Sequence, residues 1–450
     1  ALFEWKKIAQ PVRVEAVAPA RGRIRIHNEQ DFTDLSWLTG HFELSVDGRV
    51  VQRGKLPRLA IPPGESRTFT LPLRASHPAG GEERRLTLRF RTARATAWAP
   101  RGHEVGWEQL DLPHPRTRRA PARALGPTVR PLELDQDEGM AVVHGEAVRV
   151  EFDRARGLVR SLRWSDREIL AAGPRLDVFR APTDNDGVKA WPVPDSRALG
   201  RWLAWGLDAL EPAPIATTLR RARDGSVRVD VEHRLQARGD DDGRAAERMI
   251  VHRQQLRIEP DGILLARHVF EVGAALDDLP RLGIGLALSP GFDHLEWLGR
   301  GPHESYVDRK RGAAIGRYAG SVSEQLHPYV VPQETGNKTD VRWLALRGVE
   351  GPGVLFVGRR PFEASALHVD AHDLFRARHV NELEPRAETF VHLDVGQRGL
   401  GTASCGPDTL PRYRIATGRH RLDLWLAPWA PSRDPAKLAA RIRSDGFALR

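Results

Sequence analysis

The side chains best suited to chemistry are concentrated in one short stretch, Thr183-Asp184-Asn185-Asp186-Gly187. Two aspartates flank an asparagine, and the glycine behind them predicts a sharp turn that exposes these oxygen-bearing side chains. Carboxylate and amide groups can accept and donate hydrogen bonds to the hydroxyls of a sugar. The alternative is an Asx-type turn whose carboxylates bond nearby backbone N–H groups. A calcium loop is a third interpretation, but the ligand spacing and terminal Glu of such a loop are missing.

A second stretch carries two carboxylates, in the run Gly301-Pro302-His303-Glu304-Ser305-Tyr306-Val307-Asp308-Arg309. Two carboxylates about 5 Å apart could serve a retaining glycosidase. The neighbouring arginines favour a different interpretation, in which Glu304, Asp308 and Arg309 form a charge-assisted cluster. We therefore predict a structural role for this motif.

A third stretch, His368-Val369-Asp370-Ala371-His372-Asp373, has the residue types of a metal site. On a strand, His368, Asp370 and His372 would share one face, as zinc ligands could. The run could equally form a turn, and we predict no metal in this chain. His368 with Glu382 or Asp373 is also the best pair for the general acid and base of a sugar epimerase.

The elements that must position these residues are strands. Residues 1–112 contain short runs in which polar and apolar residues alternate, and this period of two places one face of each strand in a core. Asp47-Gly48 between two such runs predicts a tight hairpin. Gly and Pro turns separate the runs, and no helical stretch interrupts them. This pattern predicts an immunoglobulin-like β-sandwich.

The rest of the chain divides into a linker and a larger β domain. Residues 113–131 are rich in Pro and Arg without periodicity, which predicts a semi-extended linker. Residues 132–450 again alternate, and Leu282–Leu288 predicts a more buried strand. Only the stretches 197–210 and 435–442 have helical character. The prediction is all-β: a small sandwich followed by one large sandwich.

Composition limits the possible partners and compartment. The formal net charge is +10, but 62 of the 69 basic residues are Arg spread along the whole length, whereas nucleic-acid binders usually concentrate basic charge in a patch. No apolar run approaches the roughly 20 residues that a membrane-spanning helix needs. The single Cys excludes an intrachain disulfide and suits a reducing compartment. We expect a cytoplasmic protein with neither nucleic acid nor membrane as a partner.

The motifs together resemble the C-terminal region of the large β-galactosidases of glycoside hydrolase family 2. The resemblance rests on the two motifs at 180–188 and 297–309, on 327–337 and 399–407, and on 102–109 at the end of the first domain. It implies an immunoglobulin-like domain followed by a large galactose-mutarotase-like supersandwich. It also implies retaining hydrolysis of terminal β-D-galactosides such as lactose.

The resemblance further implies that the two catalytic glutamates lie upstream of residue 1, in a barrel that also carries the Mg²⁺ and Na⁺ sites. The chain has no initiator Met, and we expect it to be part of a longer, homo-oligomeric enzyme and inactive alone. Its partners would be the upstream catalytic domains and the β-galactoside.

The resemblance assigns a pocket wall to Asp184, Asn185 and Asp186, and a loop beside the galactose pocket to Gly187, Val188, Lys189, Ala190 and Trp191. Beyond Trp191 the chain diverges, since Pro192 and Pro194 stiffen it. The pocket would also include Ser404 and Cys405.

Many enzymes of the family have a tryptophan where this chain has Cys405, and that ring stacks on the sugar beyond the galactose. A thiol has no aromatic face, so we predict a weaker preference for the glucose half of lactose or a different aglycone. As a lone Cys, Cys405 is otherwise interpreted as an inert side chain.

Two alternatives remain open. The chain could be the non-catalytic small subunit of a split β-galactosidase, or a free-standing aldose epimerase or carbohydrate-binding protein.

Overall fold

The computed structural model describes residues 2–74, 83–113, 130–189, 191–194, 196–239, 243–348 and 351–444. The chain divides into two compact units, one formed by residues 1–120 with 309–317, the other by 121–308 with 318–450. The first unit thus includes a short segment from far along the sequence. Of the predicted linker at 113–131, residues 114–129 lie outside the described part of the chain.

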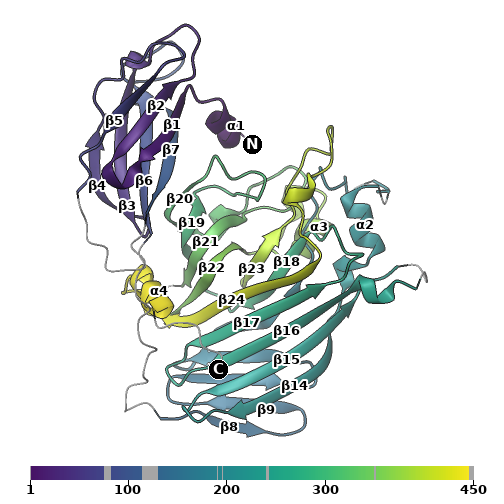
Figure 1. Cartoon of the computed structure of the whole chain (residues 1–450). Coiled ribbons are helices and arrows are strands. Elements are labelled where there is room, and N and C mark those ends of the chain that lie inside the picture. The colour runs from purple at the N-terminus through teal and green to yellow at the C-terminus, as the bar shows by residue number, and fades with distance from the viewer. Residues whose placement is uncertain are drawn as a thin grey trace. The chain divides into compact units, whose positions relative to one another are not determined.

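The first unit is a sandwich of two antiparallel sheets (Figure 1). One sheet has the order β1-β2-β5 and the other the order β4-β3-β6-β7. Alternate residues, such as Ile24, Ile26, Phe42 and Leu88, point into one shared core. The bounds are β1 (Val12–Ala18), β2 (Arg23–Asn28), β3 (Leu38–Val46), β4 (Arg49–Lys55), β5 (Ser66–Thr70), β6 (Arg84–Thr92) and β7 (Glu104–Leu112).

Local sequence signals account for one turn and miss one helix in this unit. Asp47 and Gly48, between β3 and β4, both have positive φ, 46° and 78°, as the predicted hairpin requires. The helix α1 (Leu2–Ile8) was not predicted, because its 7 residues are too few to show a helical period. The Glu4 carboxylate accepts from the Gly312 N–H at 2.7 Å, which holds α1 to the 309–317 segment.

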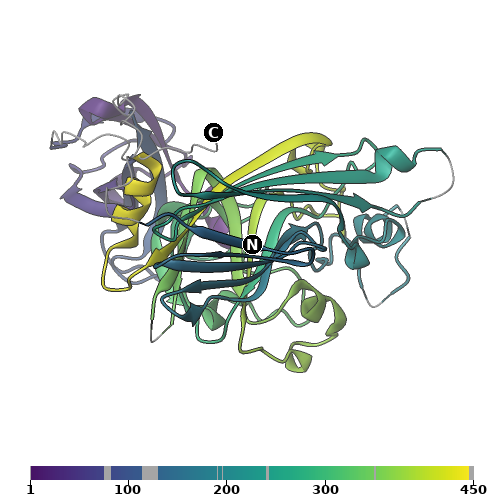
Figure 2. The same ribbon diagram turned by 90° about the horizontal axis from the view of Figure 1, so that it is seen from below.

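The second unit is built on one large sheet, to which a smaller sheet adds a second layer (Figure 2). Among the described residues the large sheet runs β13-β18-β23-β22-β24-β17-β16-β15-β14, with β19, β20 and β21 branching from it, and the smaller sheet runs β12-β11-β10-β9-β8. Core residues of both sheets, among them Trp164, Leu256 and Phe270, form one continuous apolar cluster.

The strands of the smaller sheet are β8 (Glu133–Gln136), β9 (Met140–His144), β10 (Val148–Asp153), β11 (Leu158–Trp164) and β12 (Arg167–Glu168). Those of the large sheet are β13 (Leu170–Asp177), β14 (Ala213–Arg221), β15 (Val227–Gln236), β16 (Met249–Ile258), β17 (Leu264–Val272), β18 (Arg281–Leu288), β19 (His294–Gly301), β20 (Ala314–Ser321), β21 (Lys338–Arg347), β22 (Gly353–Leu367), β23 (Thr389–Gln397) and β24 (Gly418–Trp429).

The predicted fold class, all-β with an immunoglobulin-like sandwich before a large supersandwich, is confirmed. Every residue of β18 is buried, as its apolar run predicted. The helices α2 (Ala198–Ala204) and α4 (Pro435–Ser444) fall where helical character was predicted, whereas α3 (Ala371–Arg376) was missed. Within the described ranges, no helix combines the length and apolarity needed to cross a membrane.

Candidate functional site

Strand order brings three distant segments to one edge of the large sheet. Strands β13 and β23 both pair antiparallel with β18, so their C-terminal ends lie at the edge where β18 begins. The turn after β13 contains Arg180 and Asp186, the loop after β23 begins with Arg398, and Asp278 directly precedes β18. These residues therefore meet although they lie far apart in the sequence.

A buried ion pair closes the turn at 180–187. The Arg180 guanidinium donates to both carboxylate oxygens of Asp186, at 3.1 and 3.0 Å. The same carboxylate accepts from the backbone N–H and the hydroxyl of Thr183, both at 2.9 Å. The prediction that this stretch exposes its oxygen-bearing side chains is therefore wrong for Asp186, whose side chain is fully buried. Burial is possible because two arginines compensate its charge.

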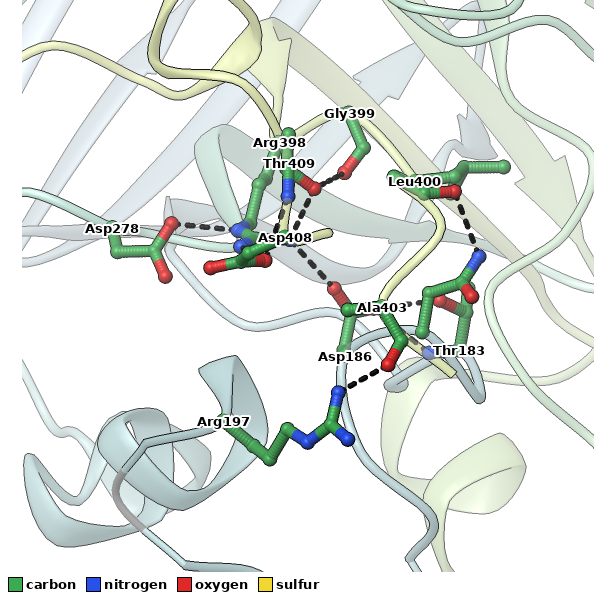
Figure 3. Close-up of polar contacts among 12 residues, drawn as sticks. Thr183, Asp186, Arg197, Asp278, Arg398, Gly399, Leu400, Ala403, Asp408 and Thr409 are labelled. Carbon is green, nitrogen blue, oxygen red and sulfur yellow. Dashed lines mark hydrogen bonds and ion pairs between the residues drawn. The ribbon is translucent and has the colours of Figure 1, made fainter. Parts of the chain in front are cut away.

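The second arginine is Arg398, the centre of the network in Figure 3. Its guanidinium donates to Asp278 at 2.6 Å, to Asp408 at 2.6 Å and to Asp186 at 3.2 Å. Its backbone carbonyl accepts from Arg180. Burial opposes the charged form of Arg398, but the carboxylates of Asp186 and Asp278 outweigh it and raise the pKa of Arg398 above its ordinary value.

Asn185 joins the turn to the loop that follows Arg398. Its amide donates to the Gly401 carbonyl at 2.9 Å, and its side-chain oxygen accepts from the N–H and the hydroxyl of Ser404 at 3.1 and 2.7 Å. Arg197 adds a bond to the Ala403 carbonyl, also drawn in Figure 3. Two segments that the sequence analysis assigned to the wall or loop of one sugar pocket, 184–188 and 404–405, are thus directly bonded to each other.

Asp308 holds the backbone of the same loop. Its two carboxylate oxygens accept from the backbone N–H groups of Leu400 and Gly401, at 3.0 and 2.8 Å. Gly399 leaves room for this contact, because a Cβ at that position would lie 2.7 Å from the Asp308 carboxyl carbon. The 301–309 motif therefore contributes a loop support to this site.

Glu304, from the same motif, bonds a different segment. Its carboxylate accepts from the Tyr329 hydroxyl at 2.6 Å and from the Gly336 N–H at 3.0 Å. Tyr306, which is buried, donates to it at 3.3 Å. Glu304 and Asp308 thus each hold backbone elsewhere in the second unit, whereas Arg309 belongs to the segment of the first unit.

The loop beyond the turn is tied down by Lys189. Its ammonium donates to the Pro332 carbonyl at 2.7 Å and to the carbonyls of Leu374 and Ala377, where α3 ends. Burial lowers the pKa of Lys189 to about 8. Gly187 has a φ of +146°, and a Cβ there would lie 2.8 Å from the Val193 side chain. The chain leaving the turn is therefore held by specific contacts.

Several groups of the site face outward. Asp184, Ser404 and Cys405 are exposed, and Asn185 and Val188 are half-buried. Trp191 exposes 71% of its surface, which is unusual for so large an aromatic residue. These outward-facing residues supply hydroxyl, carboxylate and amide groups and an aromatic ring, which are the kinds of group that bind sugars.

The third sequence motif does not form the strand that a zinc site would need. Asp370 is the N-cap of α3 and shares a capping box with Asp373, with bonds of 2.7 and 3.0 Å. His372 stacks on Phe179, with ring centroids 5.3 Å apart. In the described ranges, no three His, Cys, Asp or Glu side chains are grouped in a way that could hold a metal ion.

The candidate epimerase pair is also engaged elsewhere. His368 donates through Nδ1 to the Glu388 carbonyl at 2.9 Å, and Glu382 pairs with His379 at 2.9 Å. Asp373 contacts Arg386 besides capping α3. These bonds stabilise local structure, so the positions of the three side chains are accounted for without proton transfer.

Sequence reasoning missed Arg398, Asp278 and Asp408. All three lie outside the strands, and nothing in their local pattern distinguishes them from the many other charged residues. The one usable signal is that Arg398 follows closely, after Gly396 and Gln397, on the alternating run at 392–395.

Comparisons with known proteins agree with these observations. The family model described as "Beta galactosidase small chain" matches residues 144–426, and that described as "Beta-galactosidase, domain 4" matches residues 24–113. A β-galactosidase of Priestia megaterium is 31% identical over 93% of this chain and 38% of its own length. One of Arthrobacter sp. (strain B7) is 30% identical over 92% of this chain and 40% of its own length. The chain thus spans about two fifths of the relatives it matches.

Solved structures give weaker likenesses. The galactose 1-epimerase of Lactobacillus acidophilus NCFM aligns with 66% of this chain and 98% of its own, at 7% identity and a TM-score of 0.33. A putative aldose 1-epimerase of Escherichia coli K12 aligns with 65% of this chain at the same TM-score and 11% identity. Scores this low support no argument about function. The first family model covers well over half of the sequence, and the chain therefore belongs to the β-galactosidase small chain family.

Proposed function

We propose that this chain is the C-terminal, non-catalytic part of a retaining β-galactosidase acting on terminal β-D-galactosides such as lactose. It contributes a wall and a loop of the sugar pocket. Its membership of the β-galactosidase small chain family supports this proposal, as do relatives that are named β-galactosidase and are more than twice its length. In the proposed enzyme one glutamate attacks the anomeric carbon and a second protonates the leaving oxygen. Both glutamates belong to the portion outside this chain.

The observation that carries the proposal is the bonding of Asn185 to both Gly401 and Ser404. It joins two segments 219 residues apart into one surface that presents polar groups, and the exposed Trp191 follows six residues after Asn185 in the chain. Buried ion pairs that Arg180 and Arg398 make with Asp186 hold the turn that carries this surface. A surface held this firmly can hold its hydrogen-bonding groups in place before substrate arrives, which reduces the entropy lost on binding.

Individual residues of this surface receive distinct roles in the proposal. Asp184 and Ser404, both exposed, hydrogen-bond sugar hydroxyls or the rim of the barrel. Trp191 offers the aromatic face that Cys405 cannot provide. Because Trp191 stands on a different loop from the family tryptophan, the second sugar of the substrate is bound in another position, and the preference for glucose there is weaker.

The remaining expectations belong to the same proposal. The Mg²⁺ and Na⁺ ions act in the catalytic barrel, and no described residue of this chain is assigned to them. The full enzyme is a cytoplasmic homo-oligomer, with neither nucleic acid nor membrane as a partner.

A second candidate is the small subunit of a β-galactosidase made of two separate chains. The specific observation in its favour is the description of the matching family as a small chain. The two candidates share the same site and differ in whether the catalytic portion is covalently joined to this chain. To distinguish the two candidates, the active enzyme is purified from its source and the sizes of its chains are measured under denaturing conditions. One large chain supports the first candidate, and two chains support the second.

The direct test is hydrolysis of a chromogenic β-galactoside with Mg²⁺ present. The purified 450-residue chain alone shows no turnover, and adding the separately produced catalytic portion restores it. The catalytic portion alone serves as the control. Turnover by the 450-residue chain alone would contradict the proposal, and Glu304 and Asp308 would then be the first residues to substitute.

A further inference from the structure

A cavity of about 830 Å³ lies at the end of strand β24, where the chain turns into helix α4. Figures 1 and 2 show α4, in yellow, following β24. One face of α4 buries Ala439 and Ile442 in a cluster of tryptophans and aliphatic residues. With 3.6 residues per turn, Lys437 and Arg441 lie together on another face, about 6 Å apart along the axis.

The lining of this cavity combines apolar walls with a basic rim. Pro352, Pro428, Trp429, Pro431 and Leu438 supply the apolar part. Arg433, Lys437 and Arg441 supply three positive charges, against the single carboxylate of Asp434. All three cations are exposed. A mainly apolar cavity of this volume with a few charged groups is typical of a small-molecule site.

The three cations have no partner among the residues that the structure describes. In the part of the chain that the structure describes, no ion pair or side-chain hydrogen bond of Arg433, Lys437 or Arg441 occurs, whereas Arg398 and Arg180 each bind carboxylates. The Asp434 carboxylate is occupied in part, because it accepts from the Ala436 N–H at 3.0 Å as α4 begins. Among the described residues of the rim, the three positive charges therefore outnumber the one negative charge.

The loop that carries Arg433 is already fixed. The Trp429 indole donates to the Arg433 carbonyl at 2.7 Å, and the Arg433 N–H donates to the Ala430 carbonyl at 2.8 Å. The indole itself is buried. A ligand therefore meets a formed site and has little backbone to order, which favours binding.

We propose that this cavity binds a small organic anion with at least two negative charges and a compact ring or apolar body. Guanidinium groups match the paired oxygens of phosphate or carboxylate groups, and the lysine adds a third charge. Sugar phosphates and polycarboxylates share this chemistry. The site has no residue in common with the Asn185 surface, so the proposal is independent of the proposed hydrolase function.

The test is isothermal titration calorimetry of the full chain at low salt with glucose 6-phosphate, citrate, inorganic phosphate and uncharged glucose. We expect one saturable site for glucose 6-phosphate or citrate, weaker binding of inorganic phosphate, and none of glucose. The double variant Lys437→Glu/Arg441→Glu should weaken binding by roughly tenfold or more. Added salt should weaken it as well. The affinities of the two organic anions decide between a sugar phosphate and a polycarboxylate.

The matched control is Arg160→Glu, a charge reversal at an exposed position of β11 outside the cavity lining. It should bind like the unaltered chain, and thermal unfolding should show that both variants are folded. The proposal is overturned if none of the anions binds up to about 10 mM, or if the double variant binds as well as the control. It is also overturned if only polymers such as heparin or single-stranded DNA bind, since the surface would then serve acidic macromolecules.

Discussion

Arginines are used in opposite ways at two places in the second unit. Beneath the Asn185 surface, Arg180 and Arg398 are fully buried and each is paired with carboxylates. Around the cavity at α4, Arg433 and Arg441 are exposed and have no carboxylate partner among the described residues. The residue type is the same, but pairing and burial decide its role. A paired, buried arginine fixes the backbone, and an unpaired, exposed one is available to a ligand.

The largest effect should follow from removing the central arginine of the buried network. Arg398→Met removes one of the two arginines that pair with Asp186 and one of the arginines that pair with Asp278, and breaking a buried ion pair typically costs about 3–5 kcal/mol. We expect the free energy of unfolding in urea to fall by that amount. Arg419→Met, an exposed position at the start of β24, is the control and should change little. An equally small loss at Arg398 would mean that the network does not hold the loops.

A pH series tests a second way of burying a basic group, as a neutral histidine. His252 and His268 are buried side by side, 3.1 Å apart, and burial lowers the pKa of both, that of His268 to about 4. As the pH falls, the unfolded chain takes up these protons near pH 6.5, before the folded chain does. The contribution of the two neutral histidines to the free energy of unfolding is therefore fully present above pH 6.5 and is lost as the pH drops towards 4. The expected slope is on the order of 1 kcal/mol per pH unit for each histidine.

Urea unfolding of the chain between pH 7 and 4.5 measures this loss. His252→Phe should flatten the profile, because the ring is replaced by one that cannot take up a proton and that fits beside Phe270. His294→Phe, at an exposed position, should leave the slope unchanged. A profile that is identical in all three proteins would assign the acid sensitivity to other groups.

A smaller effect on stability but a clear effect on activity is expected at Asn185. Asn185→Ala removes its bonds to Gly401 and Ser404, and the net loss should be roughly 1–3 kcal/mol. In the reconstituted enzyme we expect a higher KM for the β-galactoside, because the pocket wall is no longer held in place. Asn381→Ala, in an exposed turn, is the control. An unchanged KM would remove the 184–188 turn from the proposed pocket.

The smallest effect on stability belongs to the cavity rim. Lys437→Glu/Arg441→Glu should leave the midpoint of thermal unfolding nearly unchanged, because neither side chain has a partner to lose among the described residues. A marked drop would show that these cations do have a structural role, and the contrast between the two arginine sites would fail.

The candidate site could be predicted only in part. The 180–188 and 399–407 segments were recognised through the family resemblance, and Asn185 and Ser404 were both named. Their direct bond was not predicted, since no local pattern relates residues 219 positions apart. The burial of Asp186 was missed for the same reason, because one of its two arginine partners follows a strand that lies two places away in the sheet.

By itself, the sequence determined the class of fold, because alternation with a period of two is a local property of each strand. It also determined the Asp47-Gly48 hairpin and the helices near residues 197–210 and 435–442. Only the tertiary structure decided that β13, β18 and β23 are neighbours and that Arg180, Asp278 and Arg398 therefore meet. It also decided that the cations of α4 line a cavity in which Asp434 supplies the one carboxylate among the described lining residues. Such contacts depend on the order of strands in the sheet, which core packing across the whole chain selects and no short stretch of sequence specifies.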